Sequence, residues 1–108
     1  MIEWMRPFLL SATLLLAGAC TSMTSVQLQK IDSLRAEQNA CLSGNVPQFE
    51  DGTSEPARIG HFVAMSCTVE TDKLLQYAVP YASSAERTAF QRDAAFRATG
   101  FVLRARAQ

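Results

Sequence analysis

The amino-acid sequence predicts a small all-α domain: a helical hairpin, a third helix at the C-terminus, and one intrachain disulfide. Apolar residues recur at intervals of three or four positions in three separate segments, the spacing of amphipathic helices. Turn-forming or helix-breaking residues separate these segments. Apart from the short run 101–103, no stretch of four or more residues alternates as a strand does. The 108 residues are enough for one small domain at most.

The first predicted helix starts at Ser25. Charged side chains alternate here with apolar residues at helical spacing, namely Val26, Ile31, Leu34, Cys41 and Leu42. Residues 44–47, which include Gly44 and Pro47, are expected to end or kink the helix, since proline lacks the backbone N–H and glycine is a poor helix former.

The second predicted helix follows a turn at residues 50–54. Thr53 or Ser54 is expected to cap it, with Glu55 and Pro56 in its first turn. Pro80 is expected to end it. One face carries a stripe that we expect to be buried, and this stripe includes the second cysteine of the predicted disulfide: Ile59, Val63, Cys67, Thr71, Leu74 and Ala78.

The third predicted helix covers residues 85–107, with Ser83 or Ser84 as its N-cap. It is apolar on two sides. One side carries Phe90, Ala94, Ala98, Phe101 and Ala105; nearly the opposite side carries Ala89, Phe96 and Leu103. A helix with two apolar faces needs two neighbours, either within its own bundle or in a partner.

Residues 1–19 have the three parts of a secretory signal peptide: a basic residue, Arg6, an apolar run over residues 8–19, and small residues before Cys20. The alternative is an uncleaved membrane-spanning helix, which needs about 20 apolar residues, more than this run offers. Cleavage would leave a short tether, residues 20–25, and a helical domain, residues 26–108.

The sequence Leu16-Ala17-Gly18-Ala19-Cys20 resembles the lipobox of bacterial lipoproteins, although Ala17 and Gly18 depart from its commonest residues. The resemblance implies that Cys20 carries a covalent lipid, and the alternative is an unmodified cysteine after an ordinary signal. No other cofactor is expected. Two or more acyl chains are enough for stable membrane anchoring. Because Thr21 rather than Asp follows Cys20, the resemblance also implies an outer-membrane location on the periplasmic side of the cell envelope.

The tether between the lipid and the first helix is short. Residues 21–25 reach at most roughly 17 Å when extended. We therefore expect the domain to lie against the bilayer surface.

Export would expose the remaining cysteines, Cys41 and Cys67, to oxidising conditions, and only one pairing is possible between them. The alternative is a pair of buried thiols. Cross-linking residues at this separation stabilises a fold by roughly 3 to 4 kcal/mol on the chain-entropy estimate. The sequence offers no further cysteine or second histidine for a metal site.

A second resemblance covers residues 36–75. It rests on Asn39-Ala40-Cys41-Leu42, on the turn at residues 50–54, and on Ile59, Val63 and Cys67. These residues resemble a pattern in small two-cysteine exported proteins of proteobacteria, a group without an assigned activity. The resemblance implies the helical hairpin and indicates no chemistry.

The composition argues against catalysis and against nucleic-acid binding. Ten basic side chains balance ten acidic ones, so net charge gives no attraction to polyanions. His61 is the only histidine and has no partner at a catalytic spacing. Glu50 and Asp51 could bind a cation, but before Gly52 they are more typical of a turn. We expect no enzyme, no catalytic residue and no metal.

Two functions remain. The first is a non-catalytic envelope lipoprotein that binds a protein partner or supports the envelope. The second is a small lysis or immunity-type lipoprotein that acts on membranes through residues 84–108. This segment contains five arginines and only two acidic residues, Glu86 and Asp93. These arginines scatter around the helix, which also fits an ordinary solvated face.

Overall fold

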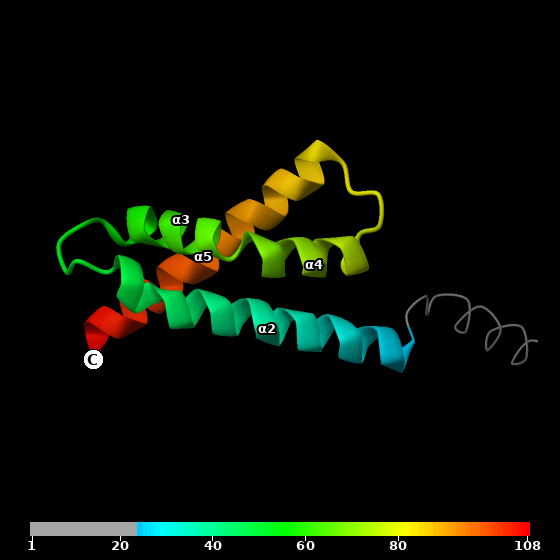
Figure 1. Cartoon of the computed structure of the whole chain (residues 1–108), viewed down its shortest axis with the longest axis horizontal. Helices are drawn as coiled ribbons and strands as arrows, with labels where there is room; N and C mark the ends of the chain where they lie inside the picture. The colour runs from blue at the N-terminus through cyan, green and yellow to red at the C-terminus, as the bar shows by residue number, and fades with distance from the viewer. Residues whose placement is uncertain (1–23) are drawn as a thin grey trace, which may run out of the picture.

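The computed structural model describes residues 24–108, and this range contains four helices and no strand: α2 (Ser25–Phe49), α3 (Pro56–Ser66), α4 (Thr68–Ala78) and α5 (Ser84–Ala107). In Figure 1, α3 and α4 run antiparallel to α2, and α5 crosses them obliquely. The predicted all-α class and the helical hairpin are therefore confirmed. The predicted signal peptide and Cys20 lie outside the described residues.

Helix α2 begins at the predicted place but ends later than expected. Thr24 and Gln27 form a capping box, in which each side chain accepts a hydrogen bond from the other residue's backbone N–H. The sequence predicts that residues 44–47 end or kink this helix, and an end there is wrong, because α2 continues past Pro47 to Phe49. Proline here removes one hydrogen bond in the last turn, where the carbonyl of the exposed Ser43 can bond to water.

The buried face of α2 also differs from the predicted stripe. Buried residues recur every four positions and include one polar side chain: Leu34, Gln38, Leu42 and Val46. Val26, expected on this face, is 70% exposed. The first turn of α2 therefore contributes a cap and little buried area.

The predicted second helix is in fact two helices, α3 and α4, separated at Cys67. The backbone of Cys67 has φ −114° and ψ 26°, outside the α-helical region. Its N–H bonds three residues back, to Ala64, and the Ser66 hydroxyl donates to the carbonyl of Val63. Periodicity could not reveal this break, because the buried stripe passes through it in unbroken steps of four: Ile59, Val63, Cys67 and Thr71.

The start of α3 also corrects a prediction. Neither Thr53 nor Ser54 is the N-cap; Glu55 holds that position without a side-chain bond, and Pro56 is the first helical residue. Thr53 and Ser54 instead donate their backbone N–H groups to the Asp51 carboxylate. Gly52 takes φ 78° in this turn, a conformation that glycine adopts without strain.

Helix α5 has the predicted extent, and Ser83 is its N-cap. Ser83 and Glu86 form a second capping box. Backbone and hydroxyl donors of Ser83 lower the pKa of the Glu86 carboxyl. No helix within residues 24–108 is long and apolar enough to span a membrane.

The core lies where α2, α3 and α5 meet. Its buried cluster comprises Leu42, Val46, Ile59, Val63, Ala64, Cys67, Ala94, Ala98 and Val102. Helix α5 packs chiefly on α3, and α4 packs chiefly on α2. Because α5 contributes mainly alanines to the cluster, its backbone approaches α3 closely.

Gly60 marks the closest approach of α3 to α5. A Cβ added at this position would lie 2.8 Å from the backbone nitrogen of Thr99 and 3.0 Å from the carbonyl oxygen of Ala95, and would also collide with Thr99 Oγ1. Two of these obstacles are backbone atoms, which cannot move without shifting α5. Glycine is therefore required for this helix pairing.

We predict that Gly60→Ala destabilises the protein by about 1 to 3 kcal/mol, because the methyl group overpacks the α3–α5 contact. Gly44→Ala is the matched control: its Cβ meets no atom within 4 Å, and alanine should stabilise the interior of α2 by about 0.5 to 1 kcal/mol. Chemical denaturation of both variants measures the difference. Equal stabilities would contradict the close packing.

Candidate functional site

The predicted disulfide is present and joins α2 to the junction between α3 and α4. Cys41 and Cys67 have their Cα atoms 6.0 Å apart, and the bridge closes a separation of 26 residues. Cys67 is fully buried within the core cluster, and Cys41 is partly buried beside it. This is the environment of a structural staple rather than of an exposed redox centre.

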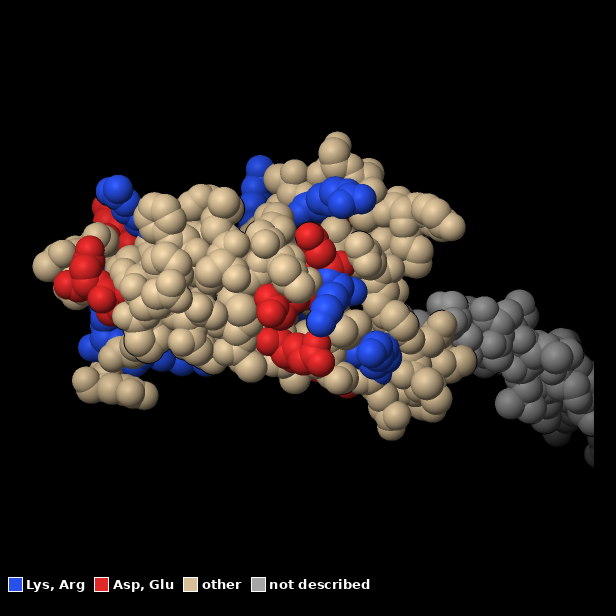
Figure 2. All heavy atoms as spheres, in the orientation of Figure 1, with Lys and Arg blue, Asp and Glu red and all other residues tan. Residues whose placement is uncertain are grey.

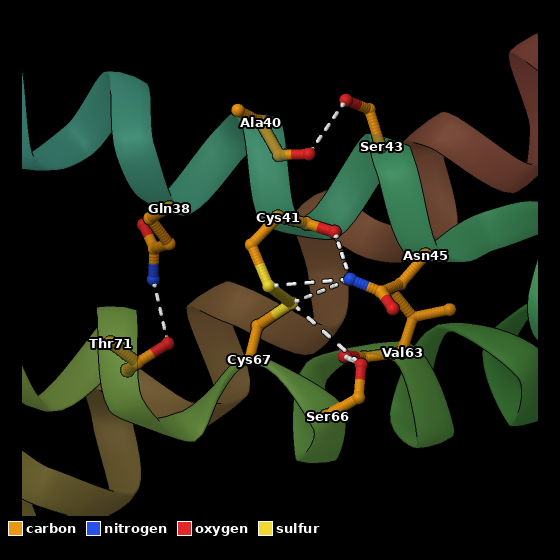
Figure 3. Close-up of a disulfide and its surroundings, with 9 residues drawn as sticks. All are labelled: Gln38, Ala40, Cys41, Ser43, Asn45, Val63, Ser66, Cys67 and Thr71. Atoms are coloured by element: carbon orange, nitrogen blue, oxygen red, sulfur yellow. Dashed lines mark hydrogen bonds between the residues drawn. A yellow bond between two sulfur atoms is a disulfide. The ribbon is translucent and has the colours of Figure 1, made fainter.

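Polar side chains surround the disulfide, as Figure 3 shows. Asn45 Nδ2 donates a hydrogen bond of 2.8 Å to the backbone carbonyl of Cys41, and it lies 3.4 Å from the Cys41 sulfur. Glu70 also lies near, and its carboxylate and the two sulfurs fall within 4.8 Å of one another. The sulfurs are bonded to each other and offer no thiolates, so this grouping is not a metal site in the oxidised protein.

A buried polar bridge next to the disulfide links three helices. Gln38 is only 1% exposed, and its side-chain amide donates a hydrogen bond of 3.0 Å to the hydroxyl of Thr71, a fully buried residue of α4. Arg97 of α5 donates a hydrogen bond of 3.2 Å to the side-chain oxygen of Gln38. It also forms an ion pair with Asp93 at 3.1 Å. Sequence reasoning missed Gln38 as a core residue, although its place four residues from both Leu34 and Leu42 signals the buried face.

Glu50 and Asp51, considered above as cation ligands, serve the fold. Arg106 of α5 donates two hydrogen bonds to the Glu50 carboxylate, at 2.9 and 2.7 Å, and a third to the carbonyl of Ser54. The guanidinium holds the pKa of Glu50 below its ordinary value, and the hydrogen bonds from Ser54 and Thr53 lower that of Asp51. Asp51 thus organises the α2–α3 loop, and Glu50 joins the end of α5 to that loop.

The two predicted apolar sides of α5 differ in their exposure to solvent. Ala94 and Ala98 of the first side are fully buried. The second side, which we call the outer face of α5, consists of Ala89, Phe96 and Leu103 and is exposed; Phe96 is 81% exposed and Leu103 53%. Within the described chain this face has no covering helix.

A groove adjoins this face, between α3 and the N-terminal half of α5. Its volume is about 390 Å³, and its walls are mostly apolar. Met65, 59% exposed, lines one wall, with His61 beside it; Arg92 and Ala95 line the other. His61 is exposed, and its ring packs edge-on against Phe62. Because Arg92 lies one helical turn before Phe96, the groove and the outer face form one continuous surface.

Figure 2 shows how the charges distribute on the view of Figure 1. Charged side chains gather near the α2–α3 loop and over α2 and α4, and basic side chains also lie over the N-terminal half of α5. Between these groups, the surface over α3 carries none in this view. An uncharged surface beside an apolar groove is typical of a protein-binding area rather than of a nucleic-acid interface.

Comparison with known proteins gives no family assignment. No protein-family model, curated protein or solved structure matches this chain.

We predict that Cys41→Ala combined with Cys67→Ala lowers the free energy of unfolding by roughly 3 to 4 kcal/mol, because the bridge no longer restricts the unfolded chain over its 26-residue separation. Reduction of the wild-type protein should act in the same direction. Denaturant unfolding measures both effects, with the exposed Ser43→Ala as a control. An unchanged midpoint would show that the staple contributes nothing.

We also predict an acid-dependent loss of stability from the Glu50–Arg106 pair. Because folding lowers the pKa of Glu50, its stabilisation is present above the ordinary value of 4.5 and disappears as the pH falls through the lower folded value. Glu50→Gln should therefore be less stable than wild type at neutral pH, and the gap should close in acid. Glu55→Gln removes the same charge outside this pair. If both variants follow wild type at every pH, the ion pair is not stabilising.

Proposed function

We propose that this protein is a non-catalytic lipoprotein of the cell envelope that binds a protein partner through the outer face of α5. The observation that carries the proposal is the exposure of Phe96, at 81%, on a helix whose opposite side forms the core. Exposed large apolar groups that adjoin an apolar groove are typical of protein-interaction sites.

The anchor in this proposal rests on the sequence. Leu16 to Cys20 resembles a lipobox, and Thr21 at the following position favours the outer membrane. The buried disulfide supports export, since such bonds persist in oxidising compartments. A lipid on Cys20 would hold the helical domain at the periplasmic side of the membrane.

The outer face of α5 is favoured over the other exposed apolar residues for a structural reason. Phe62 of α3 stacks on Phe49 at 6.3 Å between ring centroids, so part of its surface is already covered within the fold. Phe96 is far more exposed and stands beside the groove. An aromatic anchor next to a pocket is the usual arrangement of an interface hot spot.

The alternative, a lysis or immunity-type protein that inserts its C-terminal helix into membranes, receives less support from the packing. Residues 84–108 include buried core side chains, so α5 could not leave the bundle without exposing the core. Two of its arginines also bind other segments of the fold: Arg97 contacts Gln38 of α2, and Arg106 contacts Glu50 of the α2–α3 loop.

Intact mass spectrometry of the protein extracted from its native membrane tests the anchor. We expect a chain that starts at Cys20 and carries diacyl or triacyl groups. Two alkylated cysteines should appear only after reduction. A chain that still carries residues 1–19 without lipid would reject the anchor.

Crosslinking in native membranes tests the outer face. Phe96→Glu and Leu103→Glu should fold as wild type because both positions are exposed, and each should abolish the protein's crosslinked complexes and reproduce the envelope phenotype of the deletion. Val69→Glu, at an α4 residue that is 63% exposed, makes the same change elsewhere and should leave both readouts intact. Complexes that survive substitution of the outer face but not of Val69 would place the interface elsewhere.

A further inference from the structure

One end of the helical bundle gathers exposed apolar and aromatic side chains that no contact in the fold explains. This end consists of the first turns of α2 and the loop from α4 to α5, which lie at the same side of Figure 1. Four of its side chains are exposed: Val26 (70%), Leu28 (48%), Tyr77 (39%) and Tyr81 (103%). We call these four residues the tether-proximal cluster, because α2 begins five residues after Cys20.

Two adjoining hollows lie beside the two tyrosines of this cluster. A hollow of about 400 Å³ between α2 and α4 is lined by Lys30 and Tyr77, and a second hollow of about 260 Å³ is lined by Pro80 and Tyr81. Gln76 lines both. Val26 and Leu28 line neither hollow and, being two positions apart on α2, point to nearly opposite sides of that helix. The cluster therefore surrounds this end of the bundle.

Tyr81 is the strongest sign of an external role. It is the one non-glycine residue of the described chain with a positive φ, at 61°, a conformation that costs an aromatic residue more than glycine or asparagine. Its side chain is fully exposed and packs on nothing that would offset this strain. Neither the turn nor the core requires an aromatic ring here.

The distribution of charged side chains at this end of the bundle suits contact with a lipid bilayer, which has a polar headgroup layer and an apolar acyl layer. In Figure 2, the extreme end beside α2 and the α4–α5 loop is uncharged, and the charged side chains are set back from it. Those nearby in the chain are of both signs, with Lys30 and Arg87 accompanied by Asp32 and Glu86. Tyrosine rings prefer the boundary between lipid headgroups and acyl chains.

The length of the tether indicates that the lipid bilayer is what this cluster contacts. If Cys20 is lipidated, residues 21–25 allow α2 to begin at most roughly 17 Å from the acyl chains, so this end faces the bilayer before any other part of the domain can. Four side chains bury too little area to hold a domain on a membrane alone. With the lipid as anchor, their contribution is to set the orientation of the domain.

We propose that the tether-proximal cluster is a membrane-contact surface, with Tyr81 seated in the headgroup layer of the bilayer. This inference rests on the proposed function, because it requires the lipid on Cys20. The domain then stands on its end, and α2 leads away from the membrane over about 37 Å, at about 1.5 Å for each of its 25 residues. The outer face of α5 remains on the side of the molecule, accessible to a partner.

Tryptophan fluorescence tests the orientation. The only tryptophan is Trp4, within the predicted signal peptide, so a mature chain with Tyr81→Trp would carry a single reporter. The matched control is Phe96→Trp, on the outer face of α5. Each lipidated variant, with its acyl mass verified, is incorporated into vesicles of phosphatidylethanolamine and phosphatidylglycerol, and association is measured by flotation.

We expect a blue shift and quenching by brominated lipids for a tryptophan at position 81 and no change at position 96. The shift should persist at high salt, since the surface is not a basic patch. Tyr81→Asn should keep or raise the unfolding midpoint, because asparagine tolerates the positive φ, while it loosens the protection of the α4–α5 loop from protease on vesicles.

Three outcomes would overturn the inference. The first is a floating protein without a shift at position 81, which leaves the lipid anchor intact. The second is an equal or larger shift at position 96. The third is a shift at position 81 that appears without vesicles as protein concentration rises, which would assign the surface to a second copy. Failure of the lipidated chain to float would reject the anchor itself, and this inference with it.

Discussion

The disulfide at the junction of α3 and α4 is the constraint on which the rest of the structure depends. Cys67 ends one helix, starts the next, lies in the core cluster and is bonded to α2. A domain of this size buries barely enough surface to offset the entropy of ordering its chain. A covalent link between the longest helix and the break in the hairpin therefore fixes the geometry that packing alone would hold weakly.

The packing of α5 follows from this frame. With α2 and α3 held together, α5 fits across them because Ala94 and Ala98 keep its contact side small and because Gly60 of α3 leaves room for Thr99 and the backbone of α5. One layer of helices can cover one side of α5 and no more. The exposure of Phe96 and Leu103 is thus a consequence of the number of helices, and it leaves a surface that is available for binding.

The two exposed regions differ in character, which suits two different contacts. The outer face of α5 is apolar along the side of the molecule and adjoins a groove, as expected for a protein partner. The tether-proximal cluster lies at the end where α2 begins and contains two tyrosines, as expected for a membrane interface. A domain bound at its end to the bilayer would keep its side free for the partner.

The sequence by itself determined the helical class, the start of each outer helix and the cysteine pairing, because these depend on local spacing, on capping residues such as Ser83 and on an even count of cysteines after Cys20. Only the tertiary structure decided the break at Cys67, the continuation of α2 past Pro47 and the burial of Gln38. It also decided which apolar side of α5 faces the core. These outcomes depend on which atoms approach from a distant part of the chain: the spacing of Gln38 places it on the buried face of α2, but only the approach of Thr71 and Arg97 supplies the hydrogen bonds that let a polar side chain be buried there.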